Sequence, residues 1–255
     1  MPFKPVQSEK LSAGVVRQIE LLILRGVVRA GERLPSEREL SERMGVSRPS
    51  LREAIAELQS SGLLVSRANA GIFVSDDLGS AFSPALTRLL GSHEEAVFDY
   101  VSFRRDMEAL SAERACRLGS DTDLAVVDQV YQKMEAAHKK RDPGPEAALD
   151  ADFHLAIVEA SHNVVMLHMM RSMFELLREG VIYNRQVMFR QRATREHLLD
   201  QHRAINDAIQ ARDGDAARAA VEAHLDFVQG SLTDQARRDK NESIAQQRLD
   251  SMSTK

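Results

Sequence analysis

Three histidines and one aspartate are spaced so that they could bind a divalent metal ion. Asp150 and His154 lie four residues apart in the segment LDADFHLAI, so both side chains project from one face of a helix. His202 and His224 each lie among apolar residues at helical spacing, which predicts that both imidazoles point inward. The four side chains come from three expected helices and could meet in one bundle interior.

This set of residues has a defined chemistry. Neutral imidazoles with one carboxylate suit zinc, nickel or another divalent first-row metal, and they leave positions open for water or a ligand. Two other interpretations remain open from the residues alone. Each histidine could be a core residue bonded to a carbonyl group, or a bound metal could activate water in an enzyme. No convincing general base or nucleophile accompanies the set, which argues against the enzyme.

The segment 31–74 predicts a winged helix-turn-helix, a fold that places a helix in the DNA major groove. Ser36 and Glu39 have the spacing of a capping box at the start of a helix, and Gly45 suits the sharp turn that ends it. An earlier helix is expected to begin at Ser12 as its cap. A second helix after Gly45 is followed by two strand candidates, residues 63–65 and 72–74.

The second helix of this segment carries two arginines that could contact DNA. Ser47 can cap it, and Arg48 and Arg52 are four residues apart on the same face. Arginine suits both a guanine edge and a phosphate, because its planar guanidinium forms paired hydrogen bonds. The turn from Arg67 to Gly71 is small enough to enter a minor groove, with Arg67 leading. A solvated helix face is the alternative interpretation of Arg48 and Arg52.

The rest of the chain is helical in pattern. We expect a DNA-binding domain over residues 1–75, a linker with a helical turn or two over 76–94, an all-helical domain over 95–236, and a frayed polar tail over 237–255. The expected helices of the body cover residues 95–118, 122–140, 145–160, 163–189, 192–212 and 215–236.

Composition narrows the class of protein. A chain of 255 residues has room for two domains. Residues 1–75 hold 11 basic and 8 acidic side chains, against 34 and 38 in the whole chain, which fits a DNA-binding head on an acidic body. The single cysteine, Cys116, excludes an internal disulfide. No apolar run approaches the ~20 residues of a membrane span, and no signal peptide is evident, so we expect a cytoplasmic protein without a membrane partner.

The head carries a resemblance to a known family. The stretch LPSERELS, followed by GVSRPSLREAI and GLL, resembles the DNA-binding domain of GntR-family transcription regulators over roughly residues 10–75. The resemblance implies DNA contacts from arginines and serines of the two helices, with the wing tip in the minor groove. Many members have two or three glycines in the wing, whereas this chain keeps Gly71. The implied contact positions on the helices are Arg38, Ser47, Arg48, Ser50 and Arg52.

The body carries a second resemblance. The motifs D-x-x-F-H, H-R-x-I and A-H-L resemble the FCD ligand-binding domain, the all-helical effector domain of the FadR branch of the GntR family. This resemblance covers roughly residues 95–235. It implies that a metal is bound by four residues and that a small carboxylate completes the coordination shell of the metal. The four residues are Asp150, His154, His202 and His224.

The same resemblance implies residues that bind the carboxylate. Arg104 lies four residues before Glu108, and a surface salt bridge is the simple interpretation of that spacing. In FCD domains of this pattern an arginine at this position pairs with the ligand carboxylate, and the neighbouring Arg105 could take that role instead. Asn163 and Tyr183 are further candidates for the pocket.

Together these features predict a mainly α-helical protein, with an N-terminal winged helix-turn-helix and a C-terminal all-helical bundle of FCD type. The segment ASHNVVMLHMMRSMFELL and the SRPSLREAI head resemble members that respond to lactate, glycolate or pyruvate. The expected function is a homodimeric repressor that binds a palindromic double-stranded operator. A 2-hydroxy or 2-keto acid bound at the metal would modulate that binding. A metal-dependent enzyme with an attached DNA-binding domain is the alternative.

Overall fold

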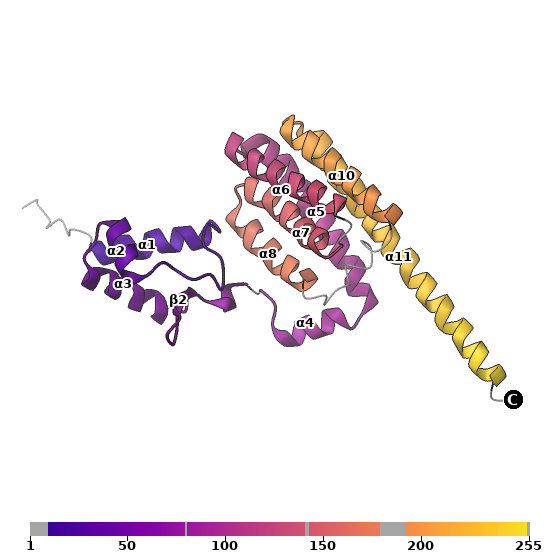
Figure 1. Cartoon of the computed structure of the whole chain (residues 1–255), viewed down its shortest axis with the longest axis horizontal. Coiled ribbons are helices and arrows are strands. Elements are labelled where there is room, and N and C mark those ends of the chain that lie inside the picture. The colour runs from indigo at the N-terminus through magenta and orange to yellow at the C-terminus, as the bar shows by residue number, and fades with distance from the viewer. Residues whose placement is uncertain (1–9, 80, 141–142, 179–191, 254–255) are drawn as a thin grey trace, which may run out of the picture. The chain divides into compact units, whose positions relative to one another are not determined.

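A computed structural model describes residues 10–79, 81–140, 143–178 and 192–253, and it is mainly helical, as predicted (Figure 1). The chain divides into two compact units. The first comprises the described residues up to Phe82 together with Leu167–Ser172, and the second comprises residues 83–166 and 173–253. The elements of the first unit are α1 (Leu11–Leu24), α2 (Glu37–Met44), α3 (Arg48–Ser60), β1 (Leu64–Arg67), β2 (Gly71–Val74) and the 3-10 turn η1 (Asp76–Gly79).

The first unit is a winged helix-turn-helix. Helices α1 and α2 both pack on α3, and β1 pairs with β2 as an antiparallel hairpin in which Leu64 lies opposite Val74. One apolar core holds these elements together, and α3 contributes its buried stripe to it. The buried residues of this core are Val15, Val16, Ile19, Ile23, Leu34, Leu40, Leu51, Ala54, Ile55, Leu58, Leu64 and Val74.

Local signals in the sequence account for the boundaries of the two central helices. The Ser36 hydroxyl accepts a hydrogen bond from the backbone N–H of Glu39, so α2 has the predicted N-cap. The helix ends at Gly45, which adopts the left-handed conformation with φ of 64°. The Ser47 hydroxyl accepts from the N–H of Ser50 and begins α3 in the same way.

Two expected caps in this unit were wrong. Helix α1 begins at Leu11 with Lys10 at its N-cap, and Ser12 is buried within the first turn rather than capping it. The Glu39 carboxylate does not reach back to Ser36. It accepts a hydrogen bond from Arg43, one turn further along α2, because this charged partner lies on the same exposed face.

The second unit is an all-helical bundle. Its elements are α4 (Pro84–Gly91), α5 (Glu94–Leu118), α6 (Asp121–Lys139), α7 (Pro143–Ala160), α8 (Val164–Arg178), α10 (Arg192–Gln210) and α11 (Gly214–Ser253). Helix α5 packs against α7 and α11, α6 packs against α7, and α10 packs against both α6 and α11.

Helix α7 is the interior helix of the bundle. Between Ala151 and Ser161 nearly every side chain is buried, because α5 and α6 both pack against it. A helix that is apolar around most of its circumference has no exposed face on which to place polar groups. Asp150 and His154 therefore lie inside the protein, where each needs a polar partner.

Helix α11 is longer than the sequence pattern predicted. The apolar pattern suggested an end near residue 236, but the helix continues to Ser253 (Figure 1). From Ala236 to Met252 every described side chain is exposed, so this part of the helix has no apolar stripe that packs within the chain. No helix among the described residues is both long and apolar enough to cross a membrane.

Two glycine substitutions should change stability in opposite directions. At Gly45 and at Gly14, inside α1, an added Cβ would meet no heavy atom within 4 Å, so only the backbone conformation distinguishes them. Gly45→Ala should lower the free energy of unfolding by about 1–2 kcal/mol, because alanine is strained in the left-handed region. Gly14→Ala should raise it by roughly 0.5–1 kcal/mol, because glycine weakens a helix interior. Urea unfolding monitored by circular dichroism measures both. Equal shifts of one sign would contradict this explanation of the turn.

Candidate metal centre and DNA-binding head

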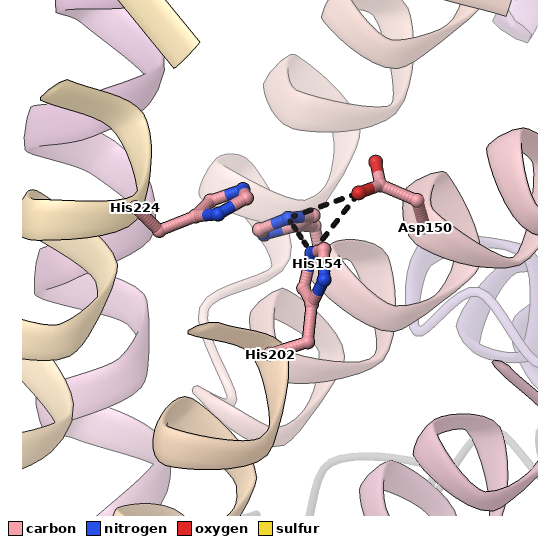
Figure 2. Close-up of side chains that lie close together, drawn as sticks. All are labelled: Asp150, His154, His202 and His224. Atoms are coloured by element: carbon pink, nitrogen blue, oxygen red, sulfur yellow. Dashed lines mark hydrogen bonds and ion pairs between the residues drawn. The ribbon is translucent and has the colours of Figure 1, made fainter. Parts of the chain in front are cut away.

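The four predicted metal ligands come together inside the helical unit (Figure 2). One potential ligand atom from each of Asp150, His154, His202 and His224 can be chosen so that all four lie within 4.8 Å of one another. The Nε2 atom of His202 lies 3.0 Å from Oδ1 of Asp150 and 3.2 Å from Nε2 of His154. All four residues are at most 2% exposed, which excludes an interpretation as solvated surface groups.

Three helices supply these side chains, as the sequence predicted. Asp150 and His154 come from successive turns of α7, His202 comes from α10, and His224 reaches the cluster from α11 (Figure 2). The three imidazole rings pack closely, with centroid separations of 5.2, 5.1 and 4.5 Å. Phe153 presents its ring at a steep angle to both His154 and His202 and closes that side with an apolar wall.

The cluster has the donors that a divalent cation requires. Asp150 brings a carboxylate, and the Nε2 atom of His202 faces both that carboxylate and another imidazole nitrogen, that of His154. A single proton on His202 could bond only one of these neighbours, whereas a divalent cation can bind carboxylate and imidazole together. The residues therefore fit a divalent metal.

A buried ion pair lies next to the cluster. Arg104 Nε lies 2.6 Å from Oε1 of Glu108, and both side chains are at most 2% exposed. The second carboxylate oxygen of Glu108 lies 2.7 Å from Nδ1 of His154. Burial is the largest influence on Glu108 and opposes its ionisation. The combined attraction of Arg104 and His154 outweighs burial and lowers the pKa of Glu108 to about 2.

The structure distinguishes the two arginines that the sequence left open. Arg105 points away from the interior and pairs with Asp226, 2.7 Å away, and more loosely with Glu222 on α11. Arg104 is buried, and its guanidinium lies 5.2 Å from the centroid of the Phe174 ring. Arg104 is therefore the arginine of this pair that lies beside the histidine cluster.

Of the other two expected effector residues, the structure describes Asn163. The Asn163 side-chain oxygen accepts hydrogen bonds from the backbone N–H groups of Val165 and Met166, so it caps α8. Its expected contact with the effector stays a prediction. Tyr183 lies outside the residues that the structure describes.

Sequence reasoning missed two polar residues around the cluster. Glu108 was considered only as a surface partner of Arg104, whereas its carboxylate contacts both Arg104 and His154. Gln201 was not considered, although its Oε1 lies 2.9 Å from Nδ1 of His224. A signal for Glu108 existed in the sequence, because Tyr100, Arg104 and Glu108 follow one another at four-residue spacing on a helix whose stripe is otherwise apolar.

The expected DNA-contacting arginines of the helices are exposed on the first unit. Arg48, at the start of α3, and Arg52, one turn later, are both exposed. Arg52 Nε donates to Glu37 of α2 at 2.8 Å, which orients its guanidinium. Arg38 is exposed beside Glu42 at 3.8 Å.

The serines at the start of α3 are already bonded to each other. The Ser47 and Ser50 hydroxyl oxygens lie 2.9 Å apart, and Ser47 also caps the helix. Their place at the N-terminus of α3 puts them beside free backbone N–H groups, where a phosphate binds favourably.

The wing differs from the expectation in one respect. Arg67 belongs to β1, and its guanidinium folds back over the Phe73 ring, 4.3 Å from the centroid, and pairs with Asp76 at 2.6 Å. Arg67 is the last residue of β1 before the turn, but the ion pair and the aromatic face draw its guanidinium back from the tip. Its expected contact with the minor groove stays a prediction. The tip is formed by residues 68–70, and Gly71 follows with φ of 108°.

Replacing Glu108 by glutamine should show how much the buried pair stabilises the fold. Because its pKa is lowered from 4.5 to about 2, the carboxylate stabilises the folded state above pH 4.5, and that contribution is lost as the pH falls toward 2. Glu108→Gln should therefore cost about 3 kcal/mol at pH 7, by leaving Arg104 without its anion, and should lose less stability than the parent between pH 5 and pH 3.

Urea titrations of the metal-free protein at these pH values test this expectation. Asp226→Asn is the matched control, since its pair with Arg105 is exposed and should contribute less than about 1 kcal/mol. Parallel pH profiles for Glu108→Gln and the parent would contradict the assigned role.

Known protein families match both units of the chain. The family models "Bacterial regulatory proteins, gntR family" and "FCD domain" match residues 11–74 and 99–227. The chain is 37% identical over 240 residues to the "Putative L-lactate dehydrogenase operon regulatory protein" of Escherichia coli (strain K12), covering 91% of this chain and 92% of that one. It is 31% identical to the Glc operon transcriptional activator of the same strain, covering 86% and 88%.

A solved structure shows the same fold. The protein described as Streptococcus agalactiae GntR superposes with a TM-score of 0.55 at 25% identity, covering 86% of this chain and 99% of that one. These relatives are transcription regulators, and the alternative of an enzyme is therefore set aside. The chain belongs to the GntR family of bacterial transcription regulators, and it joins a DNA-binding winged helix-turn-helix to an FCD domain.

Proposed function

We propose that this regulator senses a small 2-hydroxy or 2-keto carboxylate at a metal held in its FCD domain, and that the acid modulates its affinity for an operator. The observation that carries the proposal is the buried set of Asp150, His154, His202 and His224 with the cationic Arg104 beside it. Zinc or nickel suits three imidazoles and one carboxylate. Repression relieved by the acid is the proposed direction of control.

The chemistry of the site favours a carboxylate as the effector. A bound divalent cation would supply positive charge and open coordination positions, which an acid could fill with a carboxylate oxygen and its neighbouring oxygen. Arg104 brings a second cationic group, and a guanidinium binds a carboxylate with paired hydrogen bonds. Burial against Tyr100 and Phe174 strengthens such an interaction by excluding water.

The names of the relatives favour the same class of acid. One relative is named for an L-lactate dehydrogenase operon and another for the Glc operon. From these names we infer that this chain also regulates the metabolism of a small 2-hydroxy acid. Binding of the acid can change DNA affinity only if it favours one arrangement of the protein over another.

The DNA-binding unit reads its operator through α3. We propose that Arg48 and Arg52 contact base edges or adjacent phosphates, and that Arg38, Ser47 and Ser50 contact neighbouring phosphates. The tip of the hairpin, between Arg67 and Gly71, would enter the minor groove. One such unit reads only a few base pairs, so a two-fold dimer on a palindrome is proposed.

The helical unit holds the proposed dimer together. In this assignment residues 1–75 bind DNA, residues 76–94 form a linker, and residues 95–236 bind the effector and dimerise. The described part of the polar tail, residues 237–253, extends the last helix. Light scattering of the full chain should give twice the 28.5 kDa of one chain at micromolar concentration. A mass of one chain under these conditions would contradict the dimer.

The metal and the response to acid should be lost together. His202→Ala removes a central ligand and should reduce the bound metal, measured by elemental analysis, and abolish binding of lactate, glycolate and pyruvate in calorimetry. Metal affinity should also fall at low pH, because the imidazoles must be neutral to bind. His197→Ala is the matched control, since His197 lies on the same helix but is exposed and packs on Phe227. If His202→Ala bound the acid as tightly as the parent, the metal would have no part in sensing.

The arginines of α3 should govern DNA binding. Arg48→Ala or Arg52→Ala should weaken binding to an operator selected by the purified protein by roughly 1–3 kcal/mol, if each reads a base. The loss on random duplex should be smaller, because non-specific binding depends on phosphate contacts. Arg43→Ala is the control, since Arg43 is paired with Glu39 on α2. Unchanged operator affinity in both α3 variants would overturn the assignment.

A further inference from the structure

Two of the clustered histidines are contacted by polar groups that are not part of the cluster. Nδ1 of His154 lies 2.7 Å from Oε2 of Glu108, and Nδ1 of His224 lies 2.9 Å from Oε1 of Gln201. Glu108 comes from α5 and Gln201 from α10, so each contact crosses between helices. In both cases the contacted nitrogen is Nδ1, which leaves the Nε2 atom on the other side of the ring.

These contacts determine which ring nitrogen can bind a metal. A neutral imidazole carries one proton, and the nitrogen without it has the lone pair that binds a cation. The negative charge of Glu108 beside Nδ1 of His154 favours a proton on that nitrogen. The Gln201 amide oxygen does the same for His224 by accepting a hydrogen bond from its Nδ1. The lone pairs of His154 and His224 are then on Nε2. For His154 this is the nitrogen that lies 3.2 Å from Nε2 of His202.

We propose that Glu108 and Gln201 are positioning residues for the metal site, because they fix the tautomers of His154 and His224 and present both Nε2 atoms to the cluster. This inference rests on the proposed metal-dependent function. It adds to that function two residues that do not touch the metal. Outer hydrogen-bond partners of this kind orient a ligating histidine and raise its basicity.

Glu108 has a second consequence that Gln201 lacks. Its two oxygens are divided between partners, with Oε1 at 2.6 Å from Arg104 and Oε2 at 2.7 Å from His154. One carboxylate therefore joins the proposed effector arginine on α5 to a proposed metal ligand on α7. Any change at Arg104 alters the charge that His154 experiences through Glu108. Occupancy of the metal and binding of the acid should therefore influence each other, and thermodynamic linkage requires that influence to be reciprocal.

Zinc affinity of the full chain tests the proposal directly. In competition with a chromophoric chelator, Glu108→Gln should bind zinc about 10–100-fold more weakly than the parent. Gln201→Met removes the hydrogen-bond acceptor and keeps a similar side-chain volume. It should also weaken zinc binding, but by a smaller factor, because the acceptor that it removes is neutral. Glu113→Gln is the matched control. Glu113 lies on α5 and pairs with Arg218, away from the cluster. The Glu113→Gln protein should therefore bind zinc with the same affinity as the parent.

Histidine tautomers give a readout that a merely structural role would not change. In metal-free protein, long-range proton–nitrogen NMR should show His154 and His224 protonated at Nδ1 in the parent. His154 should shift toward a mixture in Glu108→Gln, and His224 should do so in Gln201→Met. If Glu108→Gln fails to fold, Gln201→Met alone decides the proposal through its own histidine.

The possible results separate this inference from the proposed function. Parent-like zinc affinity and unchanged tautomers in the folded variants would overturn the positioning role and leave the metal site intact. A parent that binds no zinc or nickel would overturn the proposed function. In that case the tautomers would still show whether Glu108 and Gln201 determine the protonation of these rings.

Discussion

The need to satisfy charge in a buried helical interior governs the second half of this protein. Asp150, Glu108 and Arg104 are each at most 2% exposed, and burying an isolated charge costs far more than a single contact returns. The bundle meets this cost by grouping the charges with three imidazoles rather than dispersing them. This grouping requires helices α5, α7, α10 and α11 to meet at one place, and their packing fixes the relative positions of the ligands.

The same constraint bears on the proposed role of the site in sensing an acid. The Arg104 guanidinium lies beside an apolar ring and is oriented by Glu108, so an acid bound as we propose would meet a buried cation. A ligand that supplies its own carboxylate adds an anion where cationic groups gather. In the proposed site, selectivity for small acids would follow from charge, because a group that leaves Arg104 or the metal poorly satisfied binds weakly.

Guanidinium groups serve different purposes in the two units. Arg104 is buried, and Glu108 holds it in place. Arg52 is exposed and donates a hydrogen bond from Nε to Glu37, so the outer edge of its guanidinium can still meet a base edge or a phosphate. Arg67 differs from both, because Asp76 and the Phe73 ring hold its guanidinium within the wing. Residue type alone predicts none of these roles, since each follows from the anion that the fold places nearby.

Local spacing determined much of this protein from the sequence alone. The cap at Ser36, the turn at Gly45 and the apolar stripe of α3 specified the winged helix-turn-helix, because caps, turns and helical faces depend on neighbours within a few residues. The spacing of Asp150 and His154, and the inward direction of His202 and His224, specified the candidate ligands for the same reason. Tertiary structure decided what depends on how one helix faces another. It chose Arg104 over Arg105, placed Glu108 and Gln201 against histidines of other helices, used Asn163 as a cap, and folded Arg67 back onto the wing. A sequence shows which side chains share a helix face, but only packing determines which distant group that face meets.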